Sequence, residues 1–231
     1  REEVTEESAE ASQQSRENGD AVTAADRVLL DAALTTGLPP VQTAATGIDA
    51  MVHAIEAYTS RHRKNPLSDL FAREALRLLS RHLVTACRDG QDRAAREGML
   101  LGANFAGQAF SNSPVGAVHA LAYPLGTLLH LPHGLANAII FPHVLAFNES
   151  AVPEKTAEVA TALGLSGAEL LPAAHGFCED LGVEMRLSAH GAARDQLPRF
   201  ASDAHAIRRL MDNNPRDMSA EDVLAIYHAA Y

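Results

Sequence analysis

The stretch GIDAMVHAIEAY, residues 47–58, places an aspartate, a histidine and a glutamate in a mostly apolar sequence. Asp49 and His53 are four residues apart, so on a helix they point the same way, and Glu56 follows three residues later on the same side. Asp49 and His53 held in this way can share one divalent metal ion, although the same spacing alone more often reflects a surface hydrogen bond. The apolar surroundings favour the metal, because a buried carboxylate and imidazole need a partner.

Four histidines form the second group of residues that can do chemistry, in the otherwise apolar stretch 118–143: His119, His130, His133 and His143. We expect His119, among small and apolar neighbours, and His133, at a predicted helix start before Gly134, to be the better metal ligands. His143 is interpreted as a core histidine that bonds to the backbone, since buried imidazoles usually satisfy themselves in that way. His130 stays open between the two roles.

The elements that must position these residues are predicted to be helices. Hydrophobic residues make up 47% of the 231 residues and aromatic residues only 5%, a mixture that favours packed helices over sheets. No alternating strand pattern of useful length occurs, so we predict an all-α helical bundle. The predicted helices cover residues 24–37, 41–60, 66–90, 92–113, 114–130, 132–150, 152–165, 168–183, 195–211 and 219–231.

Several local signals refine these helices. Ser68 or Asp69 is the expected N-cap of the helix that stops at Gly90. Pro124 is expected to bend or break its helix. Three glycines in the helix at 92–113 are expected to let neighbouring helices approach closely: Gly98, Gly102 and Gly107.

The chain is predicted to hold one domain. Residues 1–20 are rich in Glu, Ser and Gln and nearly free of large apolar side chains, which predicts a polar, flexible tail. Residues 21–231 form the expected all-helical domain, which is long enough to bury a core.

Charge and composition exclude some classes of function. The net charge of −10 argues against a nucleic-acid partner, since phosphate binding needs a basic surface. No apolar run approaches the roughly 20 residues that span a bilayer, and no signal-peptide pattern opens the chain, so we expect a cytoplasmic protein. Cys87 and Cys178 are expected to be reduced thiols.

A family resemblance becomes specific when the motifs are taken in order. The sequence resembles the C-terminal domain of the iron-dependent (group III) alcohol dehydrogenases, a dehydroquinate synthase-like helical fold, over roughly residues 26–231. The motifs that carry this resemblance are ATGIDAMVHAIEAYTS, NPLSDLFAREALRLL, AGQAFSNSPVGAVHALAYPLG, LPHGLANAIIFPHVLAFN and NNPRDMSAEDVLAIYHAAY. The resemblance implies one divalent metal, Fe²⁺ or alternatively Zn²⁺, bound by one aspartate and three histidines: Asp49, His53, His119 and His133.

The resemblance also implies a reaction. The metal would polarise the oxygen of a small alcohol or carbonyl substrate for hydride transfer with NAD(P). Family members usually carry a second histidine four residues after the one that corresponds to His119, and here that position is Tyr123. Its hydroxyl can donate a hydrogen bond or relay a proton, so Tyr123 is the candidate catalytic residue, although a tyrosine that only fills space there is about as consistent with the sequence.

A larger departure concerns the cofactor. Family enzymes are roughly twice this length, because an N-terminal α/β domain binds the dinucleotide, and no glycine-rich phosphate loop occurs in this chain. NAD(P)H binding therefore needs a domain that the chain lacks, supplied by another chain or removed by truncation. The alternatives are a metal-dependent lyase, hydratase or isomerase that has lost the dinucleotide, and a non-catalytic metal-binding domain, which a complete ligand set disfavours. We expect a homodimer or a partner chain to cover the apolar face that the missing domain would leave.

Overall fold

The computed structural model of the protein describes residues 28–165 and 169–231. The chain divides into two compact units, Arg1–Leu30 and Asp31–Tyr231. The first unit is described only at residues 28–30, which form no helix, and the predicted tail at residues 1–20 lies outside the described residues. All candidate site residues lie in the second unit.

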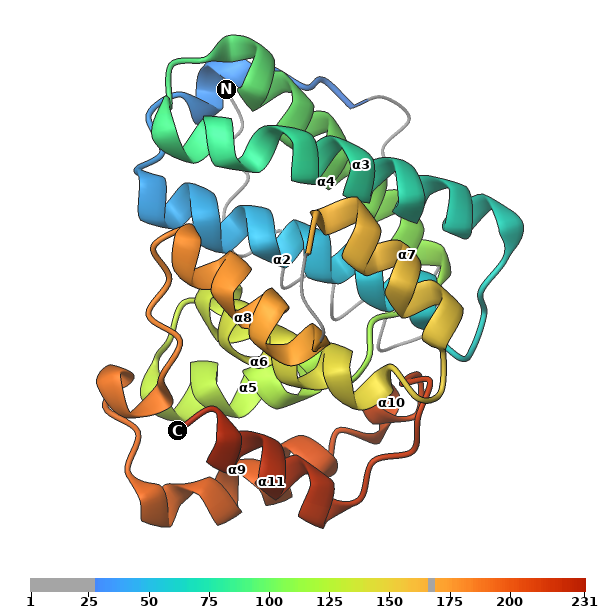
Figure 1. Ribbon diagram of the computed structural model, residues 1–231, viewed down its shortest axis with the longest axis vertical. Coiled ribbons are helices and arrows are strands. Elements are labelled where there is room, and N and C mark those ends of the chain that lie inside the picture. The colour runs from blue at the N-terminus through green and yellow to red at the C-terminus, as the bar shows by residue number, and fades with distance from the viewer. Residues whose placement is uncertain (1–27, 166–168) are drawn as a thin grey trace. The chain divides into compact units, whose positions relative to one another are not determined.

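Helices joined by short connections make up the second unit (Figure 1), and no strand occurs in the described residues, which confirms the all-α prediction. The α-helices are α2 (Pro40–Thr59), α3 (Pro66–Arg88), α4 (Arg93–Asn112), α5 (Ala117–Leu129), α6 (His133–Asn148), α7 (Pro153–Leu163), α8 (Leu170–Asp180), α9 (Leu197–His205), α10 (Arg208–Met211) and α11 (Ala220–Ala229). Three short 3-10 helices accompany them, η1 (Ala32–Thr35), η2 (Leu187–His190) and η3 (Arg194–Gln196).

The helix predicted at residues 24–37 is wrong in its described part. Residues 28–31 are not helical, and only the single turn η1 follows. Leu34 is 83% exposed, so a longer helix here would have no packed apolar face to stabilise it. The next helix, α2, begins at Pro40, a first-turn position where the missing N–H of proline costs nothing.

The start of α3 is set by Asn65, and the predicted N-cap at Ser68 or Asp69 is wrong. The Asn65 side chain accepts hydrogen bonds from the N–H groups of Leu67 and Ser68, each at 3.0 Å. In return the Ser68 hydroxyl oxygen accepts from the Asn65 N–H at 3.1 Å. Ser68 is therefore the reciprocal partner of the cap, three residues inside the helix.

Helix α2, which carries Asp49 and His53, packs against α3, α4 and α6 (Figure 1). The prediction of close helix contact holds at Gly98 and Gly102: a Cβ at Gly102 would lie 2.9 Å from Cγ of Leu79, and one at Gly98 would meet the ring of His82. The prediction is wrong at Gly107, where a Cβ would meet no atom of a described residue within 4 Å.

Helix α5 continues through Pro124, so this proline does not break it. It ends at Leu129, and its C-cap residue, His130, is a non-glycine residue with a left-handed backbone at φ 55°. The single helix predicted at residues 195–211 is wrong, because η3, α9 and α10 share that stretch and α9 ends at His205. Helix α11 packs against α9. It also bonds to α5, because the Tyr227 hydroxyl donates to the backbone carbonyl of Leu121 at 2.5 Å.

Both cysteines are free, in line with the prediction of reduced thiols. Cys178 is fully buried on α8, and burial raises the pKa of its thiol to about 12. Cys87 is half-buried on α3. Neither thiol forms part of the candidate metal centre.

Several large apolar side chains are exposed on the second unit, among them Val41 on α2 and Leu67 and Leu70 on α3. That a second chain or another domain covers such a surface stays a prediction. Within the described residues, no helix combines the length and the apolar character that crossing a bilayer requires.

Candidate metal centre

The structure brings the four predicted metal ligands together. Each of the four residues offers one nitrogen or carboxylate oxygen, and these atoms all lie within 4.8 Å of one another. Asp49 and His53 come from α2, His119 from α5, and His133 is the first residue of α6. We call these four residues the ligand cluster.

Close contact between backbones sets the distance between α2 and α6. A Cβ added at Gly134 would lie 2.6 Å from the carbonyl oxygen of Ala45, closer than real atoms approach. Only glycine therefore lets the start of α6 lie this near to α2. Because His133 precedes Gly134, this contact brings its ring beside Asp49, with Nε2 of His133 3.8 Å from Oδ1 of Asp49.

Glu56 holds the ring of His119. The Nδ1–H of His119 donates to one carboxylate oxygen of Glu56 at 2.6 Å, and the backbone N–H of Val118 donates to the other oxygen at 2.7 Å. The sequence placed Glu56 on the same side as Asp49 and His53, and the structure shows that its carboxylate contacts His119. Since Nδ1 carries the proton, the lone pair of His119 lies on Nε2.

That lone pair has no partner. Nε2 of His119 is buried and accepts no hydrogen bond from any described residue, and it lies 3.8 Å from Oδ1 of Asp49. Buried polar nitrogens are nearly always satisfied, so an unpaired one that faces a carboxylate and two more imidazoles fits a metal ligand. The donor set of one oxygen and three nitrogens suits Fe²⁺ or Zn²⁺.

The environment favours the neutral form of two of these imidazoles, those of His53 and His133. Burial, assisted by the neighbouring His119, lowers the pKa of His53 to about 4. Burial also lowers the pKa of His133. Stacking fixes the His53 ring, whose centre lies 4.5 Å from that of Phe110 and 4.6 Å from that of His119. Neutral, held imidazoles present lone pairs to a cation at neutral pH.

Asn137 is a residue of this centre that sequence reasoning missed. Its side-chain Nδ2 donates to Oδ1 of Asp49 at 2.7 Å and lies 3.0 Å from Nε2 of His133. The signal was available, because Asn137 follows His133 by four residues on an otherwise apolar helix and so lies on the same face.

The remaining candidates lie outside the ligand cluster. His130 is exposed at the end of α5. His143 is buried on α6, as expected of a core histidine, but no hydrogen bond from its ring to the backbone is present within the described residues. Tyr123 is half-buried on α5, with its ring centre 6.2 Å from that of His133, so the candidate catalytic residue borders the cluster.

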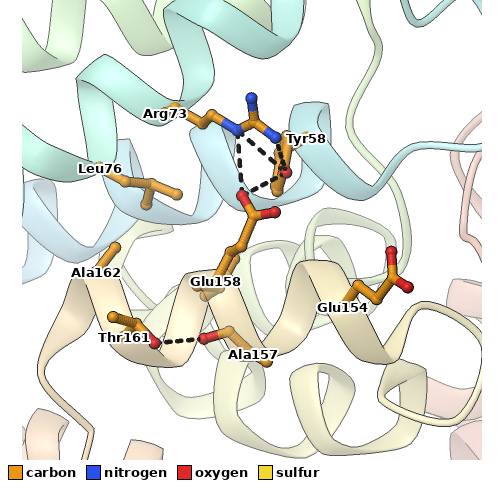
Figure 2. A pocket seen from close by; sticks show the side chains of 9 residues that line it. Tyr58, Arg73, Leu76, Glu154, Ala157, Glu158, Thr161 and Ala162 are labelled. Carbon is orange, nitrogen blue, oxygen red and sulfur yellow. Dashed lines mark hydrogen bonds and ion pairs between the residues drawn. The ribbon is translucent and has the colours of Figure 1, made fainter.

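A second polar cluster lies beside a surface pocket lined mainly by α3 and α7, where Figure 2 shows three side chains that point toward one another: Tyr58, Arg73 and Glu158. We call it the tyrosine cluster. The Tyr58 hydroxyl donates to Glu158 at 2.7 Å and accepts from Arg73 at 2.7 Å, and Arg73 also pairs with Glu158 at 3.1 Å. These three side chains bond to one another, and among the described residues none of their polar atoms is both buried and without a partner.

A family model described as "Fe-containing alcohol dehydrogenase family, C-terminal" matches residues 43–231. The chain belongs to this family. It is 39% identical over 216 residues to long-chain-alcohol dehydrogenase 1 of Geobacillus thermodenitrificans, a match that covers 90% of this chain and 54% of that protein. It is 38% identical to the sulfoacetaldehyde reductase of Bilophila wadsworthia, over 90% of this chain and 56% of that protein.

Solved structures agree with the family assignment. A crystal structure of 1,3-propanediol oxidoreductase matches with a TM-score of 0.79 and 38% identity, over 87% of this chain and 55% of that chain. The predicted family and its helical C-terminal fold are thus confirmed. The chain spans about half the length of the curated relatives it matches.

Proposed function

We propose that Asp49, His53, His119 and His133 bind one divalent metal ion, Fe²⁺ or alternatively Zn²⁺, and that the chain is the metal-binding domain of an alcohol dehydrogenase or carbonyl reductase. The observation that carries the proposal is the convergence of four donor atoms within 4.8 Å around a buried, unpaired histidine nitrogen. Membership of the iron-containing family supports Fe²⁺ as the first choice.

A divalent metal held here supplies Lewis-acid polarisation of an alcohol or carbonyl oxygen. The single carboxylate of Asp49 neutralises only part of the metal's charge, and the three imidazoles contribute none while they stay neutral. A bound divalent ion would therefore keep part of its positive charge toward the substrate oxygen, where negative charge develops.

The substrate would approach from the side of His133. The side chain of His133 is 48% exposed, whereas that of Asp49 is 18% exposed and that of His119 only 4%. Tyr123 borders His133, so its hydroxyl is the proposed group that donates a hydrogen bond to the substrate or relays its proton. Small alcohols and carbonyl compounds are the proposed substrates, since relatives are named for long-chain alcohols, 1,3-propanediol and sulfoacetaldehyde.

The hydride would be exchanged with NAD(P), the carrier that such chemistry ordinarily uses. No strand occurs in the described part of the chain, so these residues contain no turn between a strand and a helix that cradles a pyrophosphate. We therefore propose that residues other than the described ones, or another chain, hold most of the dinucleotide.

The test uses one anaerobically purified sample. Elemental analysis gives the metal content, and fluorescence titration measures NADH and NADPH binding. About one Fe or Zn per chain is expected from the single ligand cluster. A chain without metal would contradict the proposed site. Metal without dinucleotide binding would direct the search to a partner chain and to non-redox reactions that a Lewis acid catalyses alone.

A further inference from the structure

Asn137 is fully buried on α6, and its amide uses only one end. Its Nδ2 group meets two residues of the ligand cluster, at 2.7 Å from Oδ1 of Asp49 and 3.0 Å from Nε2 of His133. Its carbonyl oxygen is buried and has no hydrogen-bond partner among the described residues. A fully buried amide oxygen without a partner is costly, so packing alone does not explain an asparagine at this position.

Another buried asparagine pair in the same fold provides the contrast. Asn148 at the end of α6 and Asn214 exchange hydrogen bonds through both ends of their amides, at 2.9 and 2.8 Å. Asn214 also donates to the backbone carbonyl of Arg216 at 2.7 Å. This pair connects two segments and satisfies itself, as structural asparagines do. Asn137 instead donates from Nδ2 to the ligand cluster, and its carbonyl oxygen has no partner among the described residues.

The chemistry of the two contacts differs. A carboxylate oxygen has two lone pairs, so Oδ1 of Asp49 can accept from Asn137 and still bind a cation. The hydrogen bond thereby fixes the rotation of the Asp49 carboxylate. An imidazole nitrogen has one lone pair, so the contact between Asn137 and His133 and a metal bond to the same nitrogen exclude each other. The bond to Asp49 is therefore the contact that persists when a metal binds.

We propose that Asn137 is a positioning residue of the metal centre, which holds the Asp49 carboxylate in the orientation that binds the metal. The inference rests on the proposed function, because it presumes that the ligand cluster binds a metal. Asn137 is neutral, so it orients Asp49 without cancelling the negative charge that the metal needs. Asn137 itself donates no electron pair to the metal and acts only through its ligand.

The test compares Asn137→Leu with the wild-type chain and with the control Asn148→Ala. Leucine keeps much of the buried volume and removes both the donor and the unpaired carbonyl. Metal affinity is measured by competition with a chelator, and the visible absorption of the Co²⁺-loaded chain reports the coordination geometry. The melting temperature of the chelator-treated chain reports the fold.

For Asn137→Leu we expect metal affinity to fall roughly 10- to 100-fold, as for other residues that orient metal ligands, and the Co²⁺ spectrum to change. Its melting temperature without metal should be unchanged or higher. Asn148→Ala should melt at a lower temperature and keep the wild-type affinity and spectrum. If Asn137 were purely structural, Asn137→Leu would melt at a lower temperature and keep the wild-type affinity and spectrum. That result would overturn this inference but not the proposed function. A wild-type chain that binds no metal would overturn both proposals.

Discussion

The ligand cluster and the tyrosine cluster are both groups of polar side chains that several helices bring together. They differ in whether their buried polar atoms have hydrogen-bond partners. In the tyrosine cluster Tyr58, Arg73 and Glu158 bond to one another, and no buried polar atom among them lacks a partner within the described residues (Figure 2). In the ligand cluster, Nε2 of His119 is buried and has no partner among the residues that the structure describes. A surface pocket adjoins the tyrosine cluster, whereas the unpaired nitrogen lies in the ligand cluster. Unsatisfied buried lone pairs, more than concavity, therefore indicate where a ligand belongs.

The unpaired atoms need one further distinction. Oδ1 of Asp69 is also buried without a hydrogen bond, but the other oxygen of that carboxylate pairs with Lys64. Its charge is therefore compensated within the protein. The unpaired nitrogen of His119 differs, because it faces further donor atoms and no positively charged side chain of a described residue pairs with it.

The largest expected effect comes from removal of a ligand. His119→Ala should abolish tight metal binding, because it removes a donor atom from the ligand cluster. His143→Ala, a change at a buried histidine outside the cluster, should leave metal content intact and mainly reduce stability. Elemental analysis of both variants tests this, and equal metal loss in both would show that the ligand cluster is wrongly assigned.

Removal of a supporting carboxylate should have a smaller effect. Glu56→Ala should weaken metal binding roughly 10- to 100-fold, because the His119 ring loses the group that orients it. Glu158→Ala removes a carboxylate from the tyrosine cluster and should leave metal affinity unchanged. Chelator competition on both variants measures the difference. Similar affinities would mean that the contact between Glu56 and His119 plays no part in metal binding.

Stability at acidic pH separates burial from metal binding. Burial, assisted by His175 on α8, lowers the pKa of His143 to about 4, against an ordinary value of 6.5. As pH falls from 6.5 toward 4, His143 binds a proton in the unfolded chain but stays neutral in the folded chain. Stability is therefore lost in that pH range. His143 should contribute a loss of about 2 kcal/mol between pH 7.5 and 5.

Denaturant unfolding at the two pH values, with chelator present throughout, measures this loss. In His143→Leu the destabilisation on acidification should shrink by the same amount. Glu179, which lies 3.3 Å from His175, is unchanged in this variant. An equal pH dependence in both chains would assign the acid sensitivity to other groups.

The smallest expected effect is in the tyrosine cluster. Tyr58→Phe removes a hydroxyl that bonds to Arg73 and Glu158, but it leaves the ion pair between those two residues in place. The loss should be about 1 kcal/mol of stability, with no change in metal affinity. Denaturant unfolding and chelator competition check the two parts. A loss of metal affinity would break the distinction between the two clusters.

The sequence predicted the helices where periodicity was strong, and it failed where tertiary contacts decide. Periodicity places α2, with the Asp49 and His53 pair, in the correct segment. It cannot show that Leu34 lacks a packing partner, or that the chain turns after His205. Asn65 was overlooked as a cap because Ser68 and Asp69, close by, are also good capping residues.

Prediction of the site had the same limit. Residue context singled out His119 and His133 among the four histidines, and the family resemblance joined them to Asp49 and His53. The structure brings all four together. No spacing rule reveals that Glu56 and His119, 63 positions apart, share a hydrogen bond, because only the packing of α5 on α2 creates it. The role of Asn137 likewise depends on the contact between α6 and α2.

The tight approach of Gly134 to Ala45 has a consequence for the order of events in folding. Asp49 on α2 and Asn137 on α6 are 88 positions apart. The ligand cluster therefore assembles only after the chain has closed a long loop and docked α6 on α2. A metal ion bound by the ligand cluster would then meet a nearly finished tertiary structure and would not guide the early formation of helices. Removal of the metal should therefore speed unfolding and leave the folding rate nearly unchanged.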